Sequence, residues 1–236
     1  MLPKKERGVR GKLIVFALGG AIFNLIYGCV FLLLYFFVPQ TPVMLLFESL
    51  APLSLFEGLL ALYPAELSAG KTDGKIVLEQ IKNTPDARVM RAVLTAQGIL
   101  ITGSYLDVSR EMIFETPVVR EDDLLFLSLI QLRWQYCYFC GEKEEALSQI
   151  ERLRTLCDYT DNEEIFCDVA WGLAVLGGNR EGAEEFLTEN RIQPSPIVRV
   201  ALYREGEEEV LREIERELAV GIKALKEKML MDSRSA

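Results

Sequence analysis

The sequence of 236 residues contains no histidine. A catalytic zinc ion usually has about three protein ligands, and imidazole nitrogens are the most frequent among them. The absence of histidine therefore excludes a histidine-based zinc site from this chain acting alone. Any zinc chemistry would have to take ligands from another source.

An excess of basic residues is also missing. Lysine and arginine number 26 against 35 aspartates and glutamates, which gives a net charge of −9. Recognition of phosphates needs concentrated lysine and arginine, so this composition excludes a nucleic acid as the expected partner. Five of the basic groups gather in residues 1–12, a basic leader of net charge +4.

Paired cysteines are lacking as well. The five cysteines are odd in number and lie within apolar or helical sequence, a pattern typical of reduced thiols in the cytosol. Cys137 and Cys140 have the spacing of a zinc or redox pair, but no second pair with ligand spacing accompanies them. We expect both to be structural residues of a helix.

Long apolar runs, in contrast, are present near the N-terminus. Residues 13–38 carry no charge, and as a helix they would be roughly 39 Å long, against roughly 30 Å for the hydrocarbon core of a bilayer. A cleaved signal peptide is a poorer explanation, because the run is too long and large aromatic residues stand where a cleavage site would be. The run predicts a membrane anchor.

A second apolar run, residues 43–63, is weaker. Glu48, Pro52 and Glu57 interrupt it, and a carboxylate in mid-bilayer costs about 3 kcal/mol on insertion scales. We expect Pro52 to kink or divide the helix, and the span to pack against other helices. Two interpretations of Glu57 stay open, an intramembrane acid or base and a hydrogen-bonded packing residue near Asn24.

Residues 13–82 are therefore interpreted as a membrane hairpin in a lipid bilayer. Basic residues beside a span stay on the cytoplasmic side of the membrane. The basic leader precedes the first span, and Lys71, Lys75 and Lys82 follow the second. This pattern predicts an integral membrane protein with its N-terminus and its C-terminal domain in the cytoplasm.

Residues 83–230 predict a soluble domain of helices. Three stretches repeat an apolar helix, a glycine turn and a second helix, and their glycines, Gly103, Gly141 and Gly178, are 38 and 37 residues apart. The residue five positions after each glycine is small or β-branched, which lets paired helices approach closely: Val108, Ala146 and Ala183. The pattern resembles degenerate tetratricopeptide-like helical repeats, which would bind a protein partner.

A closing helix over residues 207–228 is expected to complete the repeats. It follows a break at Pro194 and Pro196. Its apolar stripe fits either a cap over the repeat core or a partner-binding face. Residues from Met231 onward are expected to be frayed.

Two short motifs in the membrane hairpin carry a family resemblance. Gly-Gly-x-x-x-Asn lies in the first span, and a Leu-x-Pro at the end of the second span is followed, nine residues after the proline, by Asp-Gly. This order resembles the C-terminal half of the site-2 protease family of intramembrane zinc metalloproteases. The resemblance covers residues 10–82 and is carried by Gly19, Gly20, Asn24, Leu62, Pro64, Gly70, Asp73 and Gly74.

The resemblance implies roles for these residues. In the family, the aspartate of the Asp-Gly motif is a zinc ligand, and the Gly-Gly-x-x-x-Asn helix lies beside the substrate. The implied roles are metal ligand for Asp73, substrate lining for Gly19, Gly20 and Asn24, and motif support for Pro64, Gly70 and Gly74. An ordinary helix-packing stripe is the alternative explanation of Gly19, Gly20 and Asn24.

The sequence also departs from the family. Members carry His-Glu-x-x-His on an earlier span, which supplies two zinc ligands and the general base. Ala21 and Ala61 stand where proline and asparagine are common in the family. We therefore expect zinc in the complete family enzyme, but no catalytic residue, no bound zinc and no peptidase activity in this chain alone.

Three explanations of the missing half are open. Met1 is an internal start in a longer or frameshifted gene, a separate chain supplies His-Glu-x-x-His, or the protein is an inactive relative. The predicted function is the C-terminal portion of a site-2-protease-like enzyme, and the alternative is a non-catalytic, membrane-anchored adaptor. Both predict an all-α fold, a transmembrane hairpin followed by a cytosolic helical-repeat domain.

Overall fold

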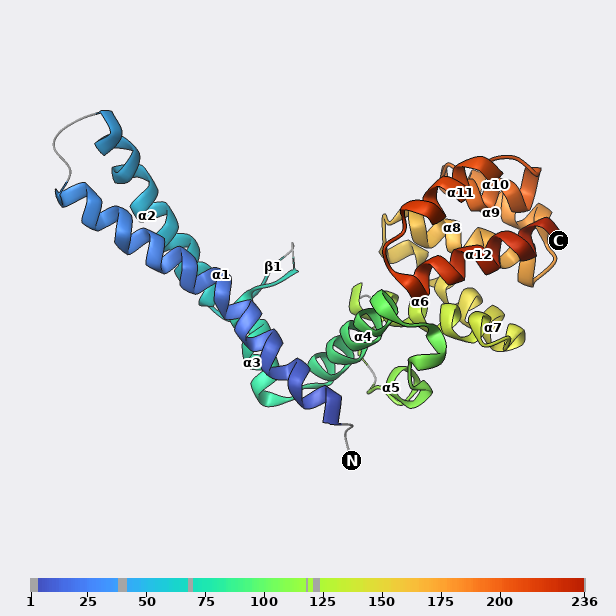
Figure 1. Ribbon diagram of the computed structural model, residues 1–236, viewed down its shortest axis with the longest axis horizontal. Coiled ribbons are helices and arrows are strands. Elements are labelled where there is room, and N and C mark those ends of the chain that lie inside the picture. Colours follow the sequence, from blue (N-terminus) through green and yellow to red (C-terminus); the bar gives the residue numbers. More distant parts are fainter. Residues whose placement is uncertain (1–3, 38–41, 68–69, 118, 121–123, 236) are drawn as a thin grey trace. The chain divides into compact units, whose positions relative to one another are not determined.

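The computed structural model describes residues 4–37, 42–67, 70–117, 119–120 and 124–235, and these are predominantly helical (Figure 1). This confirms the all-α prediction. A two-stranded hairpin of β1 (Glu66–Leu67) and β2 (Gly70–Lys71) is the β-structure found in the described ranges. The chain divides into two compact units, residues 1–91 and 92–236.

The first unit is built on two long apolar helices. α1 (Lys4–Phe37) and α2 (Pro42–Leu62) lie side by side as a hairpin (Figure 1). Both are long and apolar enough to cross a membrane, over Gly8–Phe37 and Met44–Leu62. α2 is continuous through Pro52, so of the two expected effects of the proline, a kink or a division, the division does not occur.

Small residues bring the backbones of α1 and α2 together. Ala21 and Gly28 on α1, and Ala51 and Gly58 on α2, are buried and recur at a spacing of seven, which keeps them on one face of each helix. A Cβ added at Gly58 would lie 3.0 Å from the carbonyl oxygen of Ala21. One added at Gly28 would lie 2.6 Å from Cγ of Leu55. We call these four residues the small-residue seam.

Polar contacts hold α3 (Asp73–Lys82) in the first unit. Arg10 on α1 donates a hydrogen bond to the carbonyl oxygen of Ile81 at 2.9 Å. The buried Arg91 of α4 (Pro85–Thr102) donates to the side-chain oxygen of Gln80 at 2.7 Å and to that of Asn83. These bonds join α3 to α1 and to α4.

The small-residue seam predicts a selective effect of bulk. Gly58→Val would force α1 and α2 apart, because the new side chain meets backbone, and overpacking costs about 1–3 kcal/mol. Hydrogen–deuterium exchange of the full chain in detergent would show faster exchange in both helices. The matched control is Gly20→Val, where an added Cβ meets open space. Equal acceleration in the two variants would contradict the seam.

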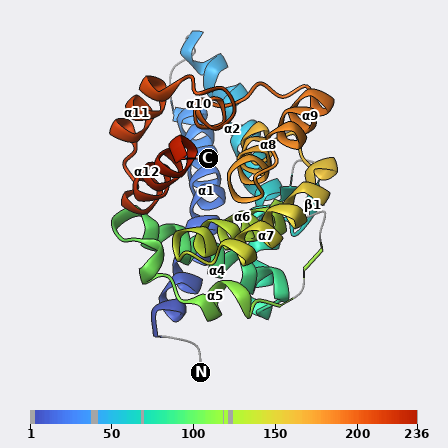
Figure 2. The ribbon, with the colours of Figure 1, turned by 90° about the vertical axis from the view of Figure 1, so that its right-hand side faces the viewer.

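The second unit is a set of short helices joined by tight turns. After α4 come η1 (Tyr105–Asp107), α5 (Arg110–Phe114), α6 (Leu124–Phe139), α7 (Lys143–Thr155), η2 (Cys157–Tyr159), α8 (Glu163–Trp171), the π-helical turn η3 (Gly172–Leu176), α9 (Arg180–Asn190), α10 (Pro196–Tyr203), α11 (Glu207–Arg216) and α12 (Val220–Ser235). α6 and α7 pair along their length, and α10, α11 and α12 pack together (Figure 2).

Glycines end two of these helical segments as the sequence suggested. Gly141 and Gly178 have φ of 85° and 64°, a left-handed conformation that glycine adopts without a steric penalty. The three small or β-branched residues that follow the turns are all buried: Val108, Ala146 and Ala183. The interpretation of these helix pairs as tetratricopeptide-like repeats stays a prediction.

The C-terminal segment differs from the expectation. One closing helix was predicted over residues 207–228, but α11 and α12 are separate helices with a break at residues 217–219. The expected fraying from Met231 onward is also wrong, because α12 continues to Ser235. Its last turns are held by buried donors: Tyr138 Oη donates to Asp232 at 2.9 Å, and Trp171 Nε1 donates to Ser233 at 2.8 Å.

Those donors belong to an aromatic cluster in the core of the second unit. Trp134, Tyr138 and Trp171 are fully buried, with ring centroids 5.0–6.3 Å apart. Such pairs contribute about 1 kcal/mol beyond the burial of their area. Tyr136, on the same helix as Trp134 and Tyr138, is half-buried.

The hydroxyl of Ser233 is expected to stabilise the second unit. Ser233→Ala would leave the buried indole N–H of Trp171 without its acceptor, at a cost of about 1–3 kcal/mol in the free energy of unfolding. Ser235→Ala is the matched control, because Ser233 and Ser235 both donate to the carbonyl four residues earlier but Ser235 is exposed. Thermal unfolding followed by tryptophan fluorescence would show a lower Tm for Ser233→Ala alone.

Candidate functional site

Asp73 is the first residue of α3, and the loop before it is tied to the end of α2 through Thr72. The Thr72 hydroxyl donates to the carbonyl oxygen of Tyr63 at 2.7 Å and accepts from the backbone N–H of Ala65 at 3.0 Å. It also caps α3 by accepting from the backbone N–H of Lys75 at 3.4 Å. One hydroxyl therefore fixes the position of Asp73 relative to α2.

Gly74 allows α3 to begin directly against the last residue of α2. A Cβ added at Gly74 would lie 2.0 Å from the carbonyl oxygen of Leu62 and 2.5 Å from its carbonyl carbon. No side chain fits there unless the backbone moves. The glycine of the Asp-Gly motif is thus required by packing, and Leu62 of the preceding motif is the residue that it contacts.

The Asp73 carboxylate is half-buried, and no hydrogen bond or ion pair to it is found among the described residues. The two nearest lysines in sequence are engaged elsewhere. Lys71 bonds Glu79 at 3.2 Å and Asp86 at 2.5 Å, and Lys75 lies 3.7 Å from Glu79. Burial lowers the pKa of Lys71, but its bonds to Asp86 and Glu79 outweigh this and raise the pKa above its ordinary value.

Asp73 also has a purely structural explanation. An acidic residue in the first turn of a helix interacts favourably with the helix dipole, by about 0.3–1 kcal/mol. The position at the start of α3 is therefore compatible with helix stabilisation as well as with metal ligation. Metal ligation would need further ligands besides Asp73.

The residues of this chain do not fit a zinc site by themselves. Within the part of the chain that the structure describes, no three histidine, cysteine or acidic side chains lie together in a group that could hold a metal ion. Cys137 is buried in α6, and Cys140 lies in the turn after it. Burial raises the pKa of Cys137 to about 12, so it is a neutral thiol at pH 7.

The Gly-Gly-x-x-x-Asn residues are not members of the small-residue seam. Gly20 is exposed, Gly19 is half-buried, and an added Cβ at either position meets open space. Asn24 is half-buried. The close packing between α1 and α2 uses Ala21 and Gly28 instead, so the helix-packing explanation of the glycine pair does not apply within this hairpin.

The other motif residues lie in the loop between α2 and α3. Pro64 and Gly70 are exposed, and Gly70 has φ of 122°, a conformation that L side chains rarely adopt. On α2, Glu48 and Glu57 are exposed on the outside of the hairpin. No hydrogen bond joins Glu57 to Asn24 among the described residues, so the structure does not support that packing interpretation.

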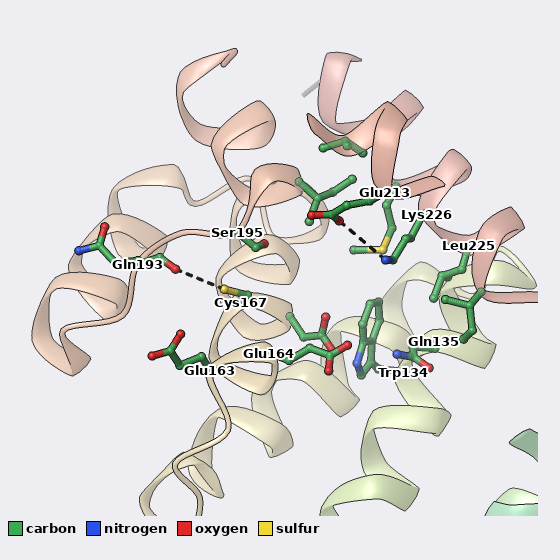
Figure 3. A pocket seen from close by; sticks show the side chains of 15 residues that line it. Trp134, Gln135, Glu163, Glu164, Cys167, Gln193, Ser195, Glu213, Leu225 and Lys226 are labelled. Carbon is green, nitrogen blue, oxygen red and sulfur yellow. Dashed lines mark hydrogen bonds and ion pairs between the residues drawn. The ribbon is translucent and has the colours of Figure 1, made fainter. Parts of the chain in front are cut away.

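A further group of polar residues, which the sequence analysis missed, lines a cavity of about 360 Å³ in the second unit (Figure 3). Its walls come from α6, α8, α10, α11, α12 and the segment before α10. Asp168 lies in this wall and accepts a hydrogen bond from Gln131 at 2.8 Å. Burial raises the pKa of Asp168 to about 7, despite the opposing effect of Gln131. The available signal was one aspartate within the apolar stretch 165–171.

The chain matches no protein-family model, no curated protein and no solved structure. A functional assignment therefore depends on the motif residues and their geometry.

The contact between Gly74 and Leu62 predicts a local effect on the α2–α3 junction. Gly74→Ala would displace α3 from the end of α2 and expose Lys71 and Lys75 to trypsin, because overpacking against backbone costs about 1–3 kcal/mol. Mass spectrometry of limited digests would show cleavage at these lysines at least several-fold faster. Gly98→Ala in α4, where an added Cβ meets open space, would leave that rate unchanged. The same rate in both variants would contradict the packing role of Gly74.

Proposed function

We propose that the chain is the C-terminal portion of a site-2-protease-like membrane zinc metalloprotease. The observation that carries the proposal is the contact of Gly74 with the Leu62 carbonyl, which positions a half-buried Asp73 at the end of an apolar helix. The Leu-x-Pro and Asp-Gly motifs of the family resemblance thus have a shared structural basis. Asp73 would contribute one metal ligand to the complete enzyme.

The hairpin of α1 and α2 would anchor the protein in the lipid bilayer. Support comes from the length and apolar character of both helices and from the basic leader that precedes the first of them. Under the positive-inside rule, the N-terminus and the second unit would both lie in the cytoplasm. The second unit would then be a cytosolic helical-repeat domain that binds a protein partner.

The outward surface of the hairpin supports a requirement for further helices. Glu48 and Glu57 are exposed on α2, and an uncovered carboxylate in hydrocarbon costs about 3 kcal/mol on insertion scales. Gly20 leaves open space on α1, where another backbone would fit closely. A segment carrying His-Glu-x-x-His, in the same gene product or in a separate chain, would cover these positions and supply the remaining zinc ligands.

The proposal implies a defined role for each motif residue of this chain in the complete enzyme. Asp73 would be an oxygen ligand, and the Gly19, Gly20 and Asn24 surface would lie beside the substrate. Zinc, when bound in the complete enzyme, supplies an activated water for peptide hydrolysis. The two imidazoles and the general base must come from outside this sequence, so the chain alone is proposed to be inactive.

A membrane-anchored adaptor is the second candidate. It is favoured because no group of three or more potential metal ligands that could hold a metal ion is found among the described residues. The second unit would then carry the function, through recruitment of a protein partner by its helices. In this case Asp73 would serve α3 through the helix dipole.

Zinc content separates the two candidates. The tagged full chain, isolated from its native membranes in mild detergent, is expected to co-purify with a polypeptide containing His-Glu-x-x-His and with about one zinc per complex. Asp73→Asn is expected to lower the zinc content at least tenfold while the complex persists. Metal analysis and mass spectrometry of the same sample give both quantities.

The matched control is Glu66→Gln, which removes an exposed carboxylate from the same loop. It is expected to retain zinc. If Asp73→Asn kept its zinc, or if the purified complex contained no such polypeptide, the metalloprotease proposal would fail and the adaptor would be favoured.

A further inference from the structure

The cavity of the second unit combines an apolar wall with an excess of acidic groups. Ile222, Leu225 and Met229 of α12 form part of the apolar wall. A volume of about 360 Å³ is within the range of small-ligand sites. The space is large enough for a side chain or a small organic molecule.

The charges around the cavity are not balanced. Four carboxyl groups line it, from Glu163, Glu164, Asp168 and Glu213, whereas Lys226 is the single cation among the described lining residues. Lys226 lies 3.8 Å from Glu213 and also 3.8 Å from Glu217, so its charge is shared between two other carboxylates. Glu163, Glu164 and Glu213 are exposed, whereas Asp168 is half-buried and forms no ion pair among the described residues. A cationic ligand would offset the cost of removing the Asp168 carboxylate from water.

A second feature is the indole of Trp134, which is fully buried and lines the cavity. Its N–H makes no hydrogen bond of ordinary geometry among the described residues, but it lies near enough to Asp168 to lower the pKa of that carboxyl. Figure 3 shows its nitrogen on the side of the cavity where Glu164 lies. The cavity thus places an aromatic side chain beside a carboxyl group.

We propose that this cavity binds an organic cation, a primary ammonium or guanidinium group on an apolar stem, with Asp168 as its counter-ion and Trp134 beside it. The apolar wall would receive the stem. The cation would come either from a free small molecule or from a lysine or arginine side chain of a protein. The proposal is independent of Asp73 and of the metalloprotease assignment.

Protonation of Asp168 would control this binding. The groups that face Asp168 come from five elements: Gln131 and Trp134 on α6, Glu164 on α8, Tyr105 on η1, Lys226 on α12 and Glu213 on α11. Burial, and to a smaller extent Glu164, raises the pKa of Asp168 to about 7 against the opposing effects of Gln131, Trp134 and Lys226. The neutral acid attracts a cation less strongly than the carboxylate, so affinity would rise with pH across this range.

The test compares three probes of similar shape on the full chain in detergent. n-Butylammonium, 1-butanol and butyrate share an apolar stem and differ in charge, and Trp134 provides an intrinsic fluorescence signal. Butylammonium is expected to bind at least tenfold more tightly than the other two. Its affinity is expected to increase about tenfold from pH 6 to pH 8, because the ionised fraction of a group with a pKa near 7 changes by that factor.

Two variants test whether butylammonium binds in this cavity. Asp168→Asn is expected to weaken butylammonium binding at least tenfold and to abolish the pH dependence, while Asp161→Asn, an exposed aspartate before α8, leaves both unchanged. Circular dichroism checks that each variant is folded, and the pH profile of the unmodified chain tests the proposal without any variant. Equal binding of butanol and butylammonium, no binding of butylammonium, or a pH-independent affinity would each overturn it.

A fourth probe separates the two sources of the cation. Nα-acetyl-lysinamide carries the same ammonium group on a peptide-like backbone. Tighter binding of this probe than of butylammonium would support the proposal with a protein side chain as the ligand. Tighter binding of butylammonium would support it with a free small molecule.

Discussion

The close approach of α1 and α2 is the constraint on which the first unit depends. Ala21, Gly28, Ala51 and Gly58 let the two backbones meet, and their spacing fixes how far one helix is shifted along the other. That shift sets where α2 ends. Because Gly74 packs on the last residue of α2, the position of Asp73 follows from the seam. A larger side chain in the seam would therefore also displace Asp73, because the helices between them are rigid.

Much of the architecture could be predicted from local patterns. Uncharged length indicated the two helices of the hairpin, and glycine turns with a small residue five positions later indicated the helix pairs, because such signals need no knowledge of distant contacts. The closing segment could not be predicted in this way. Its apolar spacing continued through residues 217–219, but the chain turns there, and the last turn of α12 is held by Tyr138 and Trp171, which lie far away in the sequence.

For the candidate sites, too, local features could be predicted from the sequence and distant contacts could not. The Asp-Gly motif was legible in the sequence, whereas the contact of Gly74 with Leu62, twelve residues earlier, was not predicted. The outward position of Gly20 was not, because a helix pattern does not reveal which of two small-residue faces meets the partner helix. The cavity around Asp168 and Trp134 had no sequence signature. Its walls come from five helices, and only the folded chain brings those side chains together.

The contacts of α12 have a consequence for the order of folding. Tyr138 bonds a residue 94 positions later, and Trp171 bonds one 62 positions later. During synthesis, α6 and α8 must therefore leave the ribosome with both aromatic donors still unpaired, and contacts of such sequence separation form slowly. Helix pairs such as α6 and α7 have local contacts and would assemble earlier. Until α12 has been synthesised, the aromatic donors of the second unit therefore lack their partners and would be accessible to a chaperone or a premature partner.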